Sequence, residues 1–171
     1  MTQEPLTLYK LIVLYMLDQV DFPLTTAQIS EFILEQGYTN YLTLQQALSE
    51  LTEAGLVDSQ TVRNRTRLTN TKEGAETLRF FGNRISDAIK EDVKNFLLEN
   101  KAQLKNDYSI TSNYYKSVSG EYEAQLMAKE KDVLLMDLRI SVPTKELAED
   151  VCLNWKKRNE EVYRMLTQML F

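Results

Sequence analysis

The chain has 171 residues, of which 43% are hydrophobic, and this is enough apolar material for one ordinary domain or two small ones. It contains no histidine and a single cysteine, so the sequence offers no imidazole for general-base, zinc or triad chemistry and no pair for an internal disulfide. We expect neither enzymatic activity nor a cofactor, and the net charge of −5 argues against a uniform phosphate-binding surface.

The start of the chain has no basic segment ahead of an apolar stretch, as a secretory signal would. Its most apolar run, Leu11 to Leu17, is far shorter than the roughly 20 residues that span a bilayer. The predicted location is therefore the cytoplasm, with no membrane association.

The first predicted helix has apolar residues at spacings of three and four and others on its remaining faces, so we expect it to be buried on most sides. Asp21-Phe22-Pro23 is expected to end it. A second helix begins after a cap at Thr25 or Thr26 and stops at Gly37. Its narrow apolar stripe is Ile29, Phe32 and Ile33.

The third predicted helix runs to about Ala54, where Gly55 closes it. It begins at Asn40, or at Thr43 if Thr43 and Gln46 form a capping box. Its inward residues are predicted to be Leu44, Ala47, Leu48 and Leu51, and its outward residues Thr43, Gln46, Ser49 and Glu50.

A two-stranded hairpin is predicted next, with Leu56 to Val62 and Arg67 to Asn70 as strands and the polar segment 63–66 as its basic tip. Thr71 then caps a fourth helix that extends to about Ser86. The predicted order of elements over residues 1–86 is thus helix, helix, helix, strand, strand, helix.

The second half of the chain begins with a long, highly charged helix over residues 87–107, which we expect to link two modules. Residues 108–171 predict a three-stranded meander and a long C-terminal helix that starts after Pro143 with Thr144 as its cap. Alternation predicts that Tyr122, Ala124, Leu126 and Ala128 share one buried face with Leu134, Met136, Leu138, Ile140 and Val142. The fold class is therefore α+β.

Positive charge is concentrated in one window. Residues 59–86 carry six basic and two acidic side chains, whereas residues 1–58 carry one and eight. Phosphate groups are recognised by such cations, and base edges by short amides and hydroxyls. The candidate phosphate contacts are Thr26, Arg63, Asn64, Arg65 and Arg67. The candidate base-edge contacts are Asn40, Thr43, Gln45, Gln46 and Ser49.

The third helix, the hairpin and the Thr71-Lys72-Glu73-Gly74 segment together resemble the pattern of winged-helix transcriptional regulators. The PadR-like and MarR-like groups are the nearest broad comparison over residues 6–86, and the whole chain more closely resembles a bacterial family of unknown function predicted to regulate transcription. The resemblance implies an N-terminal winged helix-turn-helix that places its third helix in the major groove of double-stranded DNA and its arginine-rich wing on the backbone.

A second interpretation remains open, because winged helices also serve as protein-binding modules. The third helix has no lysine or arginine, and Glu50 and Glu53 would repel phosphate.

We expect a homodimer, because one chain offers few basic contacts, and a small-molecule effector is an open possibility that the sequence does not identify. Candidate residues for the dimer surface or an effector site are Phe96, Tyr122, Trp155, Val162 and Leu166.

Overall fold

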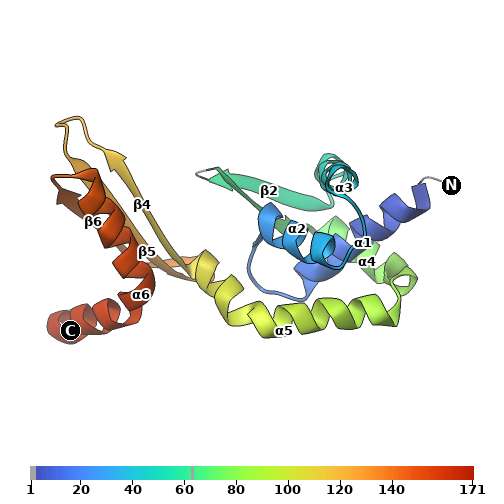
Figure 1. The fold of residues 1–171 in the computed structure, drawn as a ribbon. Coiled ribbons are helices and arrows are strands. Elements are labelled where there is room, and N and C mark those ends of the chain that lie inside the picture. The colour runs from blue at the N-terminus through green and yellow to red at the C-terminus, as the bar shows by residue number, and fades with distance from the viewer. Residues whose placement is uncertain (1–2, 63) are drawn as a thin grey trace. The chain divides into compact units, whose positions relative to one another are not determined.

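The computed structural model describes residues 3–62 and 64–171 (Figure 1). The described chain confirms the predicted α+β class, with six α-helices and two three-stranded antiparallel sheets. It divides into two compact units, Met1–Leu104 and Lys105–Phe171. Within the described residues, no helix combines the length and the apolar character that crossing a membrane requires.

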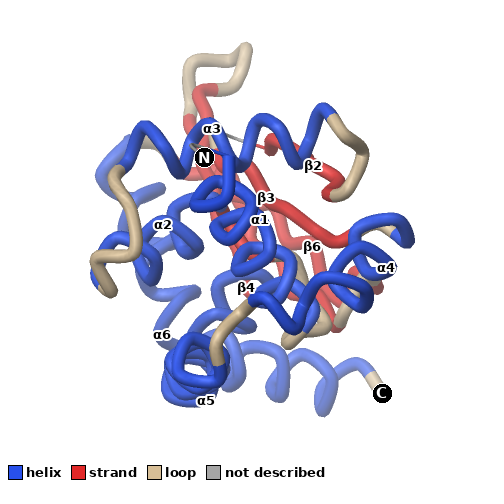
Figure 2. The backbone as a smooth tube through the Cα atoms, turned by 90° about the vertical axis from the view of Figure 1, so that its right-hand side faces the viewer, coloured by secondary structure: helices blue, strands red, loops and turns tan. Residues whose placement is uncertain are grey.

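The first unit contains five helices and a small sheet, which Figure 2 distinguishes by colour. Its elements are α1 (Gln3–Asp18), β1 (Leu24–Thr25), α2 (Thr26–Glu35), α3 (Tyr41–Glu53), β2 (Val57–Val62), β3 (Arg65–Asn70), α4 (Lys72–Phe81), a 3-10 turn (Gly82–Arg84) and most of α5 (Asp87–Ser109).

Helix α1 forms the centre of the first unit, where it packs against α3, α4 and β3. Its residues 11–17 are all buried, as the sequence predicts. The helix ends at Asp18, earlier than the predicted stop at Asp21-Phe22-Pro23. The Gln19 amide closes the last turn on the carbonyl oxygens of Tyr15 and Met16, and the chain then returns inward, since Phe22 is buried.

Helix α2 begins with a complete capping box on Thr25, which decides between the two predicted caps. The Thr25 hydroxyl accepts from the Gln28 amide at 3.0 Å, and Gln28 Oε1 accepts from the Thr25 amide at 2.9 Å. The predicted stripe Ile29, Phe32 and Ile33 is fully buried. Gly37 adopts a positive φ of 70°, as expected for a helix terminator.

The predicted two-stranded hairpin is a three-stranded sheet in the order β1-β3-β2. Leu24 and Thr25 of β1 pair with Leu68 and Arg67 of β3. The sequence prediction missed β1 because a strand of two residues shows no alternation. Strand β3 also begins earlier than predicted, at Arg65, which pairs with Val62 of β2.

Helix α4 is capped by Thr71 as predicted, but it ends at Phe81 rather than near Ser86. The 3-10 turn Gly82–Arg84 follows and places Ile85 in the core.

Helix α5 is attached to the first unit through α2 and the segment that follows it. The Phe96 ring lies 4.9 Å from that of Phe32, and the Tyr38 hydroxyl donates to Asp92 Oδ2 at 2.6 Å. Burial of the hydroxyl is the largest cause that raises the pKa of Tyr38 far above its ordinary value, and the hydrogen bond to Asp92 raises it further. The predicted linker helix thus contributes core residues, and the division between units falls near its end, after Leu104.

The second unit is a meander covered on one face by a long helix (Figure 1). Its elements are β4 (Ile110–Lys116), β5 (Tyr122–Glu130), β6 (Val133–Val142) and α6 (Lys145–Leu170), in the sheet order β4-β5-β6. Leu126, Ala128 and Trp155 form its buried centre.

The residues predicted to share one face of β6 do so except at its start, but the face is not fully buried, since Ile140 is 42% exposed. Met136, Leu138, Ile140 and Val142 pair with Ala128, Leu126, Ala124 and Tyr122. Leu134, however, pairs with Lys129, because an irregularity follows Ala128 and shifts the register by one residue. A bulge of this kind moves a side chain to the other face.

Helix α6 is not straight. Arg158 has the non-helical angles φ −126° and ψ 16°, so the helix kinks there. Val162 still packs against the buried centre, but Met169, Leu170 and Phe171 are exposed.

Candidate functional site

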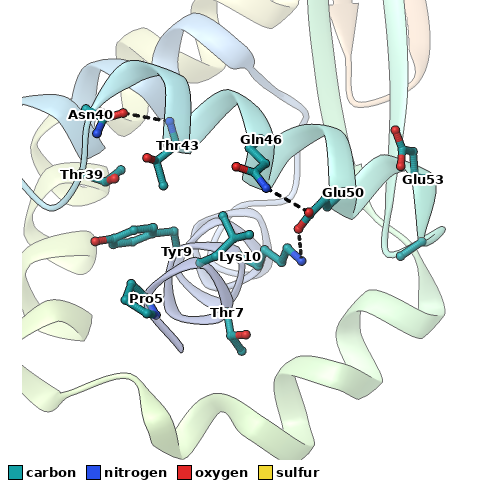
Figure 3. Close-up of a pocket in the computed structure, with 12 residues that line it drawn as sticks. Pro5, Thr7, Tyr9, Lys10, Thr39, Asn40, Thr43, Gln46, Glu50 and Glu53 are labelled. Carbon is teal, nitrogen blue, oxygen red and sulfur yellow. Dashed lines mark hydrogen bonds and ion pairs between the residues drawn. The ribbon is translucent and has the colours of Figure 1, made fainter. Parts of the chain in front are cut away.

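The polar face of α3 begins at Asn40, which caps the helix. Its Oδ1 accepts from the Thr43 amide at 2.9 Å (Figure 3). The alternative capping box between Thr43 and Gln46 does not form, because Thr43 lies inside the helix and its amide donates to Asn40. The Gln46 side chain donates to Glu50. The Asn40 amide nitrogen is thereby directed away from the helix backbone.

An open groove of about 1090 Å³ runs between α3 and the first turns of α1 (Figure 3). Lys10 of α1 forms an ion pair with Glu50 at 2.5 Å, and Gln46 Nε2 donates to Glu50 Oε1 at 3.3 Å. Hydrogen bonds from Lys10 and then Gln46 hold the pKa of Glu50 below its ordinary value. The groove is lined by residues from three segments, namely Pro5, Leu6, Thr7, Tyr9, Lys10, Thr39, Asn40, Thr43, Gln46, Glu50, Glu53 and Ala54.

The outermost stripe of α3 consists of Leu42, Gln46, Ser49 and Glu53, which follow one another at helical spacings of four, three and four. All four side chains are exposed, and Ser49 Oγ donates to Glu53 Oε1 at 3.3 Å. Gln45 lies on the flank of this stripe and is half-buried. Thr43 lies on the other flank, in the groove.

Two apolar residues at the start of α3 were not among the sequence-predicted site residues. Tyr41 is 59% exposed and Leu42 is 79% exposed, whereas a first helical turn of a core element normally buries such side chains. Their position in the sequence could have identified them, because they come before Leu44, the first residue of the buried stripe of α3.

The predicted basic tip is distributed along the hairpin rather than gathered at its end. Asn64 occupies the turn with a φ of 64°, a conformation that Asn tolerates, and Arg63 lies outside the described residues. Arg65 is exposed at the first position of β3, and Arg67 is half-buried two residues further on, opposite Gln60 and Thr25.

Arg65 and Arg67 share one face of β3, because side chains alternate along a strand. The buried Leu68 lies on the opposite face. The two guanidinium groups therefore lie on the side of the sheet that faces away from the core. Thr26, another predicted phosphate contact, is the first residue of α2, and its carbonyl accepts from Ser30 Oγ at 2.7 Å.

The junction between α3, the hairpin and α4 is held by Thr71. Its hydroxyl donates to the Gly55 carbonyl at 2.7 Å and accepts from the Gly74 amide at 3.1 Å. Its backbone amide bonds to the Leu56 carbonyl at 3.2 Å. The end of α3, both ends of the hairpin and the start of α4 are thus connected through one residue.

The predicted dimer or effector residues are distributed over both units. Phe96 packs on Phe32 in the first unit. In the second unit Trp155 is buried, with its indole nitrogen donating to the Met127 carbonyl at 3.3 Å, and Val162 packs beside it. Tyr122 lies 6.4 Å from Tyr114, centroid to centroid, and Leu166 is half-buried near the end of α6.

The surface formed by α3 and the hairpin offers amides, hydroxyls and guanidinium groups beside two carboxylates. Such groups recognise partners by hydrogen bonding and by charge. One of the carboxylates, Glu50, is paired with Lys10.

Comparison with known proteins places the chain in a family. No curated protein and no solved structure matches it. Residues 9–170 match the family described as Domain of unknown function (DUF4364), and since the match covers nearly the whole chain, the protein belongs to this family.

Proposed function

We propose that the protein is a DNA-binding transcriptional regulator, with a winged helix-turn-helix in its first unit, that acts as a homodimer. The observation that carries this proposal is the sheet β1-β3-β2, in which the hairpin directly follows α3 and is joined to the strand that precedes α2. Such an arrangement sets a polar third helix beside a projecting hairpin, which suits simultaneous contact with a groove and the adjacent backbone.

In the proposed complex α3 enters the major groove. Gln46 and Ser49 lie on the outermost stripe of α3, and the Asn40 amide lies at its start. Amides of Asn and Gln can pair with adenine, and a serine hydroxyl can pair with several bases. In the free protein Gln46 donates to Glu50 and Ser49 donates to Glu53. Because both hydrogen bonds are exposed to solvent, exchanging them for contacts with bases costs little free energy.

Arg65 and Arg67 supply the phosphate contacts of the hairpin. The ion pair of Glu50 with Lys10 reduces one of the two repulsions that α3 would otherwise present to DNA. Each chain offers few cationic side chains on the surface of α3 and the hairpin. Affinity for DNA grows with the number of phosphates that such side chains neutralise. A homodimer doubles that number, and for this reason dimerisation belongs to the proposal.

A salt titration of binding to genomic fragments tests the proposal. Each phosphate contact contributes about 0.9 to the slope of log affinity against log salt. Replacing Arg65→Ala removes one contact per chain, so the slope should become shallower by about 1.8 for a dimer and about 0.9 for a monomer.

Arg79→Ala is the matched control, because Arg79 is also exposed but lies on α4, outside the surface of α3 and the hairpin. The control should keep the wild-type slope. Absence of binding at low salt, or a slope that Arg65→Ala leaves unchanged, would refute DNA binding through this surface.

The second candidate function is a protein-binding module on the same scaffold. The exposed apolar pair Tyr41 and Leu42 favours it, because such residues at the start of a polar helix are typical of protein contacts. In that case no fragment is retained at low salt, and Leu42→Glu abolishes association with the protein partner while Arg65→Ala does not.

A further inference from the structure

Strand β6 is a long sheet edge in the second unit. Among the described strands it pairs with β5 alone, and its ten residues therefore present one row of backbone donors and acceptors without a strand partner. Proteins usually protect such edges with charge, proline or a covering element. Besides the charged residues Asp137 and Arg139, this edge carries exposed apolar side chains at Val133, Leu134, Leu135 and Ile140.

Helix α6 leaves this edge largely uncovered because it leans toward the other side of the sheet. The Tyr114 hydroxyl of β4 donates to Glu149 Oε1 at 3.0 Å, and Ser112 Oγ of the same strand donates to the Cys152 carbonyl at 3.5 Å. Leu147 precedes Glu149 by two residues and so lies on the opposite flank of the helix, where it is exposed. The exposed side chain of Leu147 thus adds apolar surface next to β6 on the face of the sheet that α6 covers.

The charges of β6 are arranged to match a second copy of the same strand. Two identical edges can pair antiparallel around a two-fold axis perpendicular to the sheet, with residues equidistant from the axis facing each other. With the axis at Leu138, Asp137 of each copy faces Arg139 of the other, and Met136 faces Ile140. Moving the axis by one residue sets either Asp137 or Arg139 against itself.

Gln125 of β5 supports this arrangement. It is 7% exposed, the one polar side chain in the buried set of the described residues, and its Nε2 donates to both Asp137 oxygens at 3.1 and 3.2 Å. The nearest Arg139 nitrogen in the same chain is 4.0 Å from Asp137 Oδ1. Asp137 is therefore held in place on the sheet, and Arg139, with a side chain that is 58% exposed, lies two residues further along the same strand.

We propose that β6 is the dimer surface: two copies pair antiparallel about Leu138, forming a continuous six-stranded sheet with both α6 helices on one face. This inference deepens the homodimer part of the proposed function and rests on it. It replaces the predicted dimer candidates on the two long helices, Phe96 on α5 and Trp155, Val162 and Leu166 on α6, with a strand edge.

Sedimentation equilibrium of charge variants tests the proposal. Asp137→Arg and Arg139→Asp each place like charges opposite each other at two symmetric points, so each should raise the dimer dissociation constant about tenfold or more. The double variant Asp137→Arg/Arg139→Asp restores opposite charges and should dimerise again. An equimolar mixture of the two single variants should form a mixed dimer, which neither variant achieves with itself.

Asp150→Arg is the control, since it makes the same charge change at an exposed position of α6. It should leave the dissociation constant unchanged, and the fluorescence of Trp155 should show that every variant is folded. A wild-type monomer at all concentrations overturns the proposal, as does single-variant dimerisation at wild-type strength or a mixture without a mixed dimer. Dimerisation lost in Met165→Glu/Met169→Glu but retained in both β6 variants overturns it in favour of the end of α6.

The two experiments distinguish a failure of the β6 dimer surface from a failure of the proposed DNA binding. Sedimentation is measured without DNA, and Arg65→Ala should sediment as the wild type does. A slope change of about 1.8 in the salt titration, together with intact dimers in the β6 variants, would keep the function and reject only this surface.

Discussion

Gly74 shows why a single position in the Thr71-Lys72-Glu73-Gly74 segment admits no side chain. A Cβ built on Gly74 would lie 2.0 Å from the Leu56 carbonyl oxygen, a backbone atom, and 3.2 Å from a Leu14 methyl. The close approach is the same contact that lets Thr71 join α3, the hairpin and α4. Packing, and not backbone conformation, therefore requires glycine here.

Gly74→Ala should lower the free energy of unfolding of the first unit by about 2 kcal/mol or more, because the added methyl forces the backbone of Leu56 away from α4. Urea denaturation followed by circular dichroism measures the loss. Gly82→Ala is the control, since its Cβ would meet nothing closer than 3.6 Å, and its stability should stay within about 0.5 kcal/mol of wild type. Equal effects of the two substitutions would contradict the packing argument.

At the scale of elements, α5 is attached to α2 and the segment after it by one partly buried hydrogen bond and one aromatic contact. Tyr38, three residues after the end of α2, donates to Asp92 on α5, while Phe32 of α2 packs against Phe96, one turn beyond Asp92 on α5. Because the acceptor is a carboxylate, this hydrogen bond is stronger than one between two neutral groups. The segment between α2 and α3 is thereby tied to α5.

Tyr38→Phe should reduce stability by about 1 to 2 kcal/mol, with most of that loss absent when Asp92→Ala, which removes the acceptor, is already present. The raised pKa of Tyr38 keeps its hydroxyl protonated in the folded protein, so stability should be full below the ordinary tyrosine value near 10 and fall as the pH rises above it. Urea denaturation of the double-mutant cycle measures both effects. Additive losses from the two substitutions would show that the bond contributes nothing, and Tyr41→Phe, on an exposed side chain, is the control.

At the scale of the whole molecule, the chain consists of two units that each have a core of their own. The first is built around α1, and the second around Leu126, Ala128 and Trp155. Trp155 is the one tryptophan in the sequence, so its fluorescence reports on the second unit alone.

Because the cores are separate, Gly74→Ala should shift the unfolding transition seen by circular dichroism but leave the midpoint of the Trp155 fluorescence transition unchanged. Urea titrations of wild type and variant with both probes test this. A fluorescence midpoint that shifts together with the circular dichroism transition would instead indicate one cooperative unit.

The positions of the candidate site residues on their elements were largely predictable, but their partners were not. Helical spacing identified the outward face of α3, whereas the contact of Gln46 with Glu50 and of Glu50 with Lys10 joins residues whose meeting depends on the packing of α1 against α3. The exposed pair Tyr41 and Leu42 was missed because apolar residues at helical spacing usually belong to a core.

The sequence by itself determined the helices, their buried faces, the caps Thr71 and Thr144 and the three-stranded meander, because each of these depends on residues within a few positions of one another. Only the tertiary structure decided that β1 joins the hairpin, that the register shifts after Ala128 and that α6 kinks at Arg158. Strand pairing and helix packing are contacts between distant residues, and a two-residue strand or a one-residue bulge has no period to reveal it.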